Sequence, residues 1–73
     1  MSRQSPKVLL FEQFARIGQA LSSGPRLELM ELLAQGERSV DVLAQLTGLT
    51  VANTSRHLQQ LRQAGLIAAR KEG

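Results

Sequence analysis

The chain contains no cysteine and only one histidine, His57, among its 73 residues. Without cysteine it forms no disulfide, no thiolate metal site and no cysteine nucleophile. A single histidine cannot form a histidine-rich metal site, and it does not stand at a usable catalytic spacing from a carboxylate. No glycine-rich phosphate loop is present. The sequence therefore predicts a protein that is not an enzyme and that carries no metal or cofactor.

Long apolar runs are also missing. No stretch approaches the length that a membrane span needs. The first residues, Met-Ser-Arg-Gln-Ser-Pro-Lys, lack the apolar core and cleavage site of a signal peptide. The lack of cysteine is compatible with a reducing compartment. We therefore expect a cytoplasmic protein with no membrane contact.

The length allows one small domain of marginal stability. On folding, so short a chain buries only about 60% of the surface that the unfolded chain exposes. Its charge is unevenly placed. Residues 1–49 hold five basic and five acidic side chains, whereas residues 50–73 hold four basic side chains against one acid. The whole net charge of +3 thus lies in the last third. A basic patch confined to one region suits a phosphate backbone, although an ordinary solvated surface has the same pattern.

Apolar periodicity and capping residues predict four helices at about 6–22, 25–35, 40–46 and 51–64. Ser5, Ser39 and Thr50 are typical N-caps. Gly36 is expected to end the second helix in the left-handed conformation, and Gly65 to end the fourth. The inner faces of the second and third helices are Leu29, Met30, Leu32, Leu33, Val40, Leu43, Ala44 and Leu46.

After the fourth helix, residues 66–70 read as the start of a strand. A single strand leaves its backbone groups unpaired, so it needs a partner strand. We therefore expect either pairing with another chain or, as we favour, a fragment of a longer protein.

The third and fourth helices have the features of a helix-turn-helix. Ala44 is small enough for two helices to cross closely there, and Gly48 tolerates a positive φ in the turn. Thr54, Leu58 and Leu61 have the phase of inward residues on the fourth helix, together with Val51 and Gly65. The alternative at this point is a plain helical hairpin in a small bundle.

The opposite face of the fourth helix favours DNA recognition. It consists of Ala52, Asn53, Arg56, Gln59, Gln60 and Gln63, and the helix contains no acid from Val51 to Ala64. Asparagine and glutamine can pair with adenine, arginine with guanine, and a small apolar group with the thymine methyl. Carboxylates on this face would be repelled by phosphate.

Several motifs in the right order resemble the ArsR/SmtB family of winged-helix repressors. They are Ala20-Leu21-Ser22, Pro25-Arg26-Leu27, Leu32-Leu33, Gly48-Leu49-Thr50, Ser55-Arg56-His57-Leu58, Leu61 and Ala64-Gly65-Leu66-Ile67. The resemblance covers about residues 11–73. It implies a mainly α-helical fold, a truncated winged helix-turn-helix with four helices and the start of a wing strand. The rest of the wing and a C-terminal dimerisation helix would lie beyond this chain.

The function that the resemblance implies is a dimeric bacterial repressor that binds a double-stranded operator palindrome and releases it on a signal. Together with the outer face of the fourth helix, it assigns DNA binding to Thr50, Ala52, Asn53, Ser55, Arg56, Gln59 and Gln60. Val51 and Ala52 stand where polar residues are frequent in the family, so apolar contact or packing is expected there.

Two further residues match the family. His57 lies at the edge of the apolar sector, so a packing or hydrogen-bonding role is expected of it. Arg26, at a helix start, is expected to pair with an acid or to be solvated. The family's cysteine pair in the third helix is absent, because that segment reads Ser39-Val40-Asp41-Val42. The nature of the signal stays open.

The first helix has a broad apolar stripe made of Val8, Leu10, Phe11, Phe14, Ala15, Ile17 and Leu21. A single helix in a small domain cannot bury all of these residues, so we expect exposed apolar surface. The resemblance implies that it packs on the terminal helix and on the partner subunit. The competing function is a protein-interaction or dimerisation module of helix-turn-helix shape that does not bind DNA.

Overall fold

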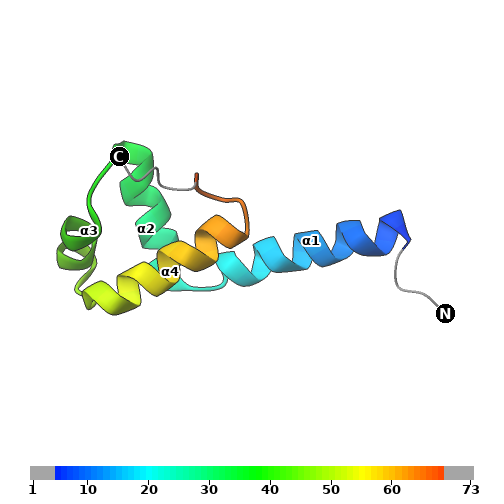
Figure 1. The fold of residues 1–73 in the computed structure, drawn as a ribbon, viewed down its shortest axis with the longest axis horizontal. Helices are drawn as coiled ribbons and strands as arrows, with labels where there is room; N and C mark the ends of the chain where they lie inside the picture. Colours follow the sequence, from blue (N-terminus) through cyan, green and yellow to red (C-terminus); the bar gives the residue numbers. More distant parts are fainter. Residues whose placement is uncertain (1–4, 69–73) are drawn as a thin grey trace.

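The computed structural model describes residues 5–68, which form four α-helices (Figure 1). The helices are α1 (Pro6–Leu21), α2 (Gly24–Gln35), α3 (Val40–Thr47) and α4 (Val51–Gln63). Their ends differ by at most one residue from the predicted ranges, and the mainly α-helical fold is confirmed. Within residues 5–68 there is no strand, and no helix there is both long and apolar enough to cross a membrane.

Each helix is preceded by an N-cap residue whose side-chain hydroxyl accepts a hydrogen bond from one of the free N–H groups in the first turn. Four side-chain oxygens accept a hydrogen bond from the backbone N–H three residues later: Ser5 at 3.2 Å, Ser23 at 3.4 Å, Ser39 at 3.2 Å and Thr50 at 3.0 Å. The first turn of a helix has no internal acceptors for its N–H groups, so these caps define where each helix starts.

Two predicted details at helix ends are different in the structure. Gly36 ends α2 with φ 153° and ψ 160°, an extended conformation open essentially to glycine alone, and not the left-handed one. Residues 66–68 form no strand, because the chain turns back at Gly65 with φ 75°. The Leu66 N–H then bonds to the Leu61 carbonyl at 3.0 Å. Residues 69–70 of the predicted strand lie outside the described residues.

The core lies between α2, α3 and α4. Its buried side chains are Ala20, Leu29, Leu43, Leu58, Leu61 and Ala64, with Met30, Leu32, Leu33, Val40, Leu66 and Ile67 packed around them. Leu66 and Ile67 join the core in place of extending into a strand, since burying them removes apolar surface from water. Helix α1 contributes only Ala20 to the buried set.

Most of helix α1 projects away from the part of the molecule formed by α2, α3 and α4 (Figure 1). The chain has a radius of gyration of 14.4 Å, whereas a compact domain of this length would have roughly 11 Å. Phe11 and Phe14 are each 56% exposed, and Leu9 and Leu10 are exposed as well. The exposed apolar surface expected on the first helix is therefore present.

Candidate nucleic-acid interface

The turn between α3 and α4 is held by backbone hydrogen bonds to one carbonyl. Gly48 adopts the left-handed conformation, with φ 73° and ψ 17°, and its N–H bonds to the Ala44 carbonyl. The Leu49 N–H reaches the same carbonyl at 3.1 Å. Ala44 itself is 4% exposed, which suits the close crossing of the two helices. Both features expected of a helix-turn-helix are therefore found at the predicted residues.

The start of α4 is fixed by two threonines. The Thr50 hydroxyl accepts from the Asn53 N–H, and the buried Thr54 hydroxyl donates to the Thr50 carbonyl at 2.8 Å. Because Thr50 accepts in its cap, its own hydroxyl hydrogen stays free to donate outward. The N-terminus of a helix also carries partial positive charge, which favours a phosphate nearby.

Replacing Thr50 by alanine should destabilise the domain by about 0.5–2 kcal/mol, because the Asn53 N–H loses its acceptor. Thermal unfolding followed by circular dichroism measures this loss. Thr50→Ser keeps the oxygen and serves as the matched control. Equal losses in both variants would show that the cap contributes nothing.

The inner face of α4 differs from the helical-wheel prediction at both of its ends. Thr54, Leu58 and Leu61 are buried as predicted, whereas Val51 is 46% exposed and Gly65 is exposed. Side chains of a helix tilt toward its N-terminus, so Val51 in the first turn extends beyond the core. Ala64 is buried at the other end of the face.

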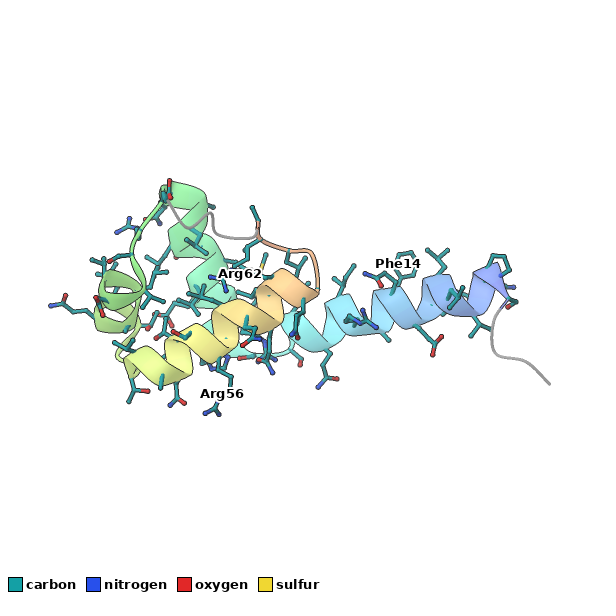
Figure 2. All side chains as sticks on the ribbon, in the orientation of Figure 1. Phe14, Arg56 and Arg62 are labelled. Carbon is teal, nitrogen blue, oxygen red and sulfur yellow. The ribbon has the colours of Figure 1, made fainter. Side chains whose placement is uncertain are left out.

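The outer face of α4 is open to solvent. The predicted residues Thr50, Ala52, Asn53, Ser55, Arg56, Gln59 and Gln60 are all exposed. Arg56 points away from the body, while Arg62 lies on the opposite side of α4, toward α2 (Figure 2). No carboxylate occurs between Val51 and Gln63, so the polar side chains on this face are amides, hydroxyls and a guanidinium group.

The side chain of Gln60, one of the predicted residues, is hydrogen-bonded to a side chain of another helix. Its carbonyl oxygen accepts from Nη1 of Arg26 at 2.6 Å. This bond uses one of the two lone pairs of the oxygen and holds it toward Arg26, so bidentate pairing of Gln60 with adenine would compete with the Arg26 contact.

Arg26 connects α1 to α4 through hydrogen bonds that the sequence did not predict. The expectation that it is solvated or paired with an acid is wrong, because its guanidinium bonds to neutral groups of two helices. Nε donates to the Ala20 carbonyl at 2.7 Å and Nη2 to the Gln19 carbonyl at 3.0 Å. Nη1 lies 3.3 Å from Nδ1 of His57 as well as contacting Gln60.

The contact with Arg26 also favours one tautomer of His57. Arginine has only donors, so Nδ1 of His57 takes part in this contact as an acceptor. The tautomer that accepts there carries its ring hydrogen on Nε2. The half-buried His57 thus has the hydrogen-bonding role expected of it.

A concave region lies beside Arg62, on the side of α4 opposite to Arg56 (Figure 2). This open cavity of about 750 Å³ is lined mainly by apolar side chains of α2, α3 and the segment after α4, and by Arg38 and Arg62. Nε of each arginine is buried without a hydrogen-bond partner among the described residues. Within that same part of the chain, no three His, Cys, Asp or Glu side chains gather as a metal site would require.

The fold and the exposed face of α4 define a helix-turn-helix DNA-binding domain, and comparisons with known proteins place it in a family. The family model "Bacterial regulatory protein, arsR family" matches residues 23–69, more than half of the chain. The chain therefore belongs to the arsR family of bacterial regulatory proteins.

Two curated relatives come from Mycobacterium tuberculosis. HTH-type transcriptional regulator Rv0324 is 48% identical over 67 residues, which cover 92% of this chain and 30% of that protein. HTH-type transcriptional regulator CmtR is 41% identical over 59 residues, covering 81% of this chain and 50% of that protein. The chain thus spans only 30% to 50% of the length of these relatives.

Among solved structures, the chain is similar to the homodimeric winged helix-turn-helix DNA-binding domain of Mb0332 from Mycobacterium bovis, a possible ArsR-family transcriptional regulator. That solution structure is 47% identical, has a TM-score of 0.85, and is matched over 100% of this chain and 68% of its own. A crystal structure of a possible transcriptional regulatory protein from the same organism is 43% identical, with a TM-score of 0.80 over 99% of this chain and 73% of its own. The winged helix-turn-helix fold class is confirmed.

Proposed function

We propose that this domain binds double-stranded DNA in a sequence-specific manner, as part of a bacterial transcriptional repressor, by placing α4 in the major groove. The observation that carries the proposal is the outer face of α4, which is exposed and free of carboxylates. The major groove admits an α-helix, and α4 stands at the edge of the domain where DNA could reach it (Figure 2).

The exposed side chains suggest a division of contacts. Asn53 and Gln59 have both an amide donor and an acceptor to offer to adenine, and Arg56 can bond to guanine or phosphate. Ala52 would meet a thymine methyl. Thr50 and Ser55, together with the N-terminus of α4, would bond to the phosphate backbone.

Assembly into a homodimer on an operator palindrome completes the binding mode. The solved domain of Mb0332 is described as homodimeric. In this chain, the apolar face of α1 is exposed and projects from the body, as a subunit contact requires. Two copies related by a two-fold axis would present their α4 helices to half-sites about 34–36 Å apart. We further propose that an inducing signal releases the operator and that the regulator acts in the cytoplasm, where bacterial DNA lies.

An NMR titration tests the DNA interface directly. The ¹⁵N-labelled chain would receive a palindromic duplex that the protein has selected from a random pool, first at low salt and then at moderate salt. We expect chemical-shift changes concentrated at residues 50–63, decreasing with salt as counterion release predicts. Changes confined to α1, or no preferred duplex in the selection, would favour the protein-interaction module instead.

A further inference from the structure

The side chain of Arg26 joins two helices that are otherwise weakly connected. Helix α1 packs against α2, and α4 packs against α2 and α3. In the described part of the chain, no hydrogen bond runs directly from α1 to α4. The Arg26 guanidinium bonds to both, at Gln19 and Ala20 on α1 and at His57 and Gln60 on α4.

The α1 side of this contact is a helix C-terminus. The last carbonyls of a helix lack internal donors and carry partial negative charge. Arg26 donates to the Ala20 carbonyl at 2.7 Å and to the Gln19 carbonyl at 3.0 Å, and the latter also accepts from the N–H and hydroxyl of Ser22. Because the guanidinium group is planar, its two bonds to α1 fix its orientation and therefore the direction in which Nη1 points toward α4.

The α4 side lies on the recognition helix itself. Nη1 bonds to acceptors one helical turn apart, His57 and Gln60, which are 31 and 34 residues distant in sequence from Arg26. Bonds at two points along α4 resist rotation of that helix about its axis as well as sliding. A rotation would change which side chains face the groove.

We propose that Arg26 is a positioning residue for DNA recognition: it holds α4 at a defined angle to α1, and so links the helix that carries the exposed apolar face to the helix that contacts bases. This inference rests on the proposed function. Lysine cannot replace Arg26, because a single ammonium group cannot bond in a fixed plane to four acceptors on two helices.

The first test needs no DNA and uses Arg26→Lys, with Arg16→Lys on the exposed side of α1 as the matched control. Long-range ¹H–¹⁵N correlation gives the tautomer of His57, and residual dipolar couplings give the angle between α1 and α4. We expect the hydrogen on Nε2 in the wild type, and a changed angle only in Arg26→Lys. A hydrogen on Nδ1 in the wild type, or an unchanged angle in Arg26→Lys, would overturn the proposal.

The second test measures the ratio of affinities for the selected palindrome and for an unrelated duplex. Arg26→Lys should lower this ratio at least about tenfold, the loss expected for a hydrogen bond to a charged group, while binding to the unrelated duplex stays within about twofold. A changed angle with an unchanged ratio would refute the role in recognition. If the wild type showed no preference for the palindrome over the unrelated duplex, the proposed function would fail, and with it the role of Arg26 in recognition. The angle between α1 and α4 would still show whether Arg26 positions the two helices.

Should Arg26→Lys fail to fold, a second variant separates the two ends of the contact. His57→Phe combined with Gln60→Ala removes the α4 acceptors and leaves Arg26 bonded to α1. The angle between the helices should change in this variant as well, with α1 retaining its helicity. An unchanged angle would count against the proposal.

Discussion

Replacing Arg56 by glutamate is expected to weaken binding to the selected palindrome at least about a hundredfold. Loss of one arginine contact to DNA costs about 1–3 kcal/mol, and glutamate adds repulsion from phosphate. In a homodimer on a palindrome the loss occurs twice. Arg56 is exposed and points away from the core, so the fold should be unaffected (Figure 2).

The milder change Arg56→Gln tests the electrostatic share of this effect. If Arg56 neutralises one phosphate, its removal should reduce the slope of log affinity against log salt by about 0.9 per protomer. Fluorescence anisotropy over a salt series measures both the affinity and the slope.

Arg16→Glu is the control for Arg56→Glu, because it changes the net charge by the same amount at an exposed position on a different helix, α1. Equal losses in the two variants would mean that total charge alone governs binding. Full binding by Arg56→Glu would show that α4 does not face the DNA.

Replacing Leu61 by alanine is expected to destabilise the domain by about 2.7–5 kcal/mol, since the side chain is fully buried and its removal leaves a cavity. A chain of this length has a total stability of roughly 4–11 kcal/mol. The variant should therefore lose a large part of its folded population. In a domain of this size, each kcal/mol lowers the thermal midpoint by about 4–8 °C.

Leu46→Ala is the matched control, because the chemical change is identical. Leu46 was predicted on the inner face of its helix, but it is 50% exposed on α3. Urea unfolding followed by circular dichroism should place the control within about 0.5 kcal/mol of the wild type. Similar losses in both variants would contradict the assignment of the core to the α2–α3–α4 interface.

The positions of the helices followed from local chemistry. Ser5, Ser39 and Thr50 each cap a helix through a bond to the third residue onward, and Gly48 permits the left-handed turn where few other residues would. Such interactions span three or four residues, so sequence spacing is enough to predict them. The outer face of α4 was predictable for the same reason, because helical periodicity sorts its residues without any other element.

The sequence by itself therefore determined the four helices, the helix-turn-helix, the exposed stripe of α1 and the carboxylate-free face of α4. Only the tertiary structure decided the partners of Arg26, the hydrogen bond to Gln60, the exposure of Val51 and the packing of Leu66 and Ile67 against the core. These features depend on which groups meet across the fold. Arg26 and Gln60 are separated by 34 residues, and no local preference of either side chain specifies that α1, α2 and α4 bring them to within 2.6 Å.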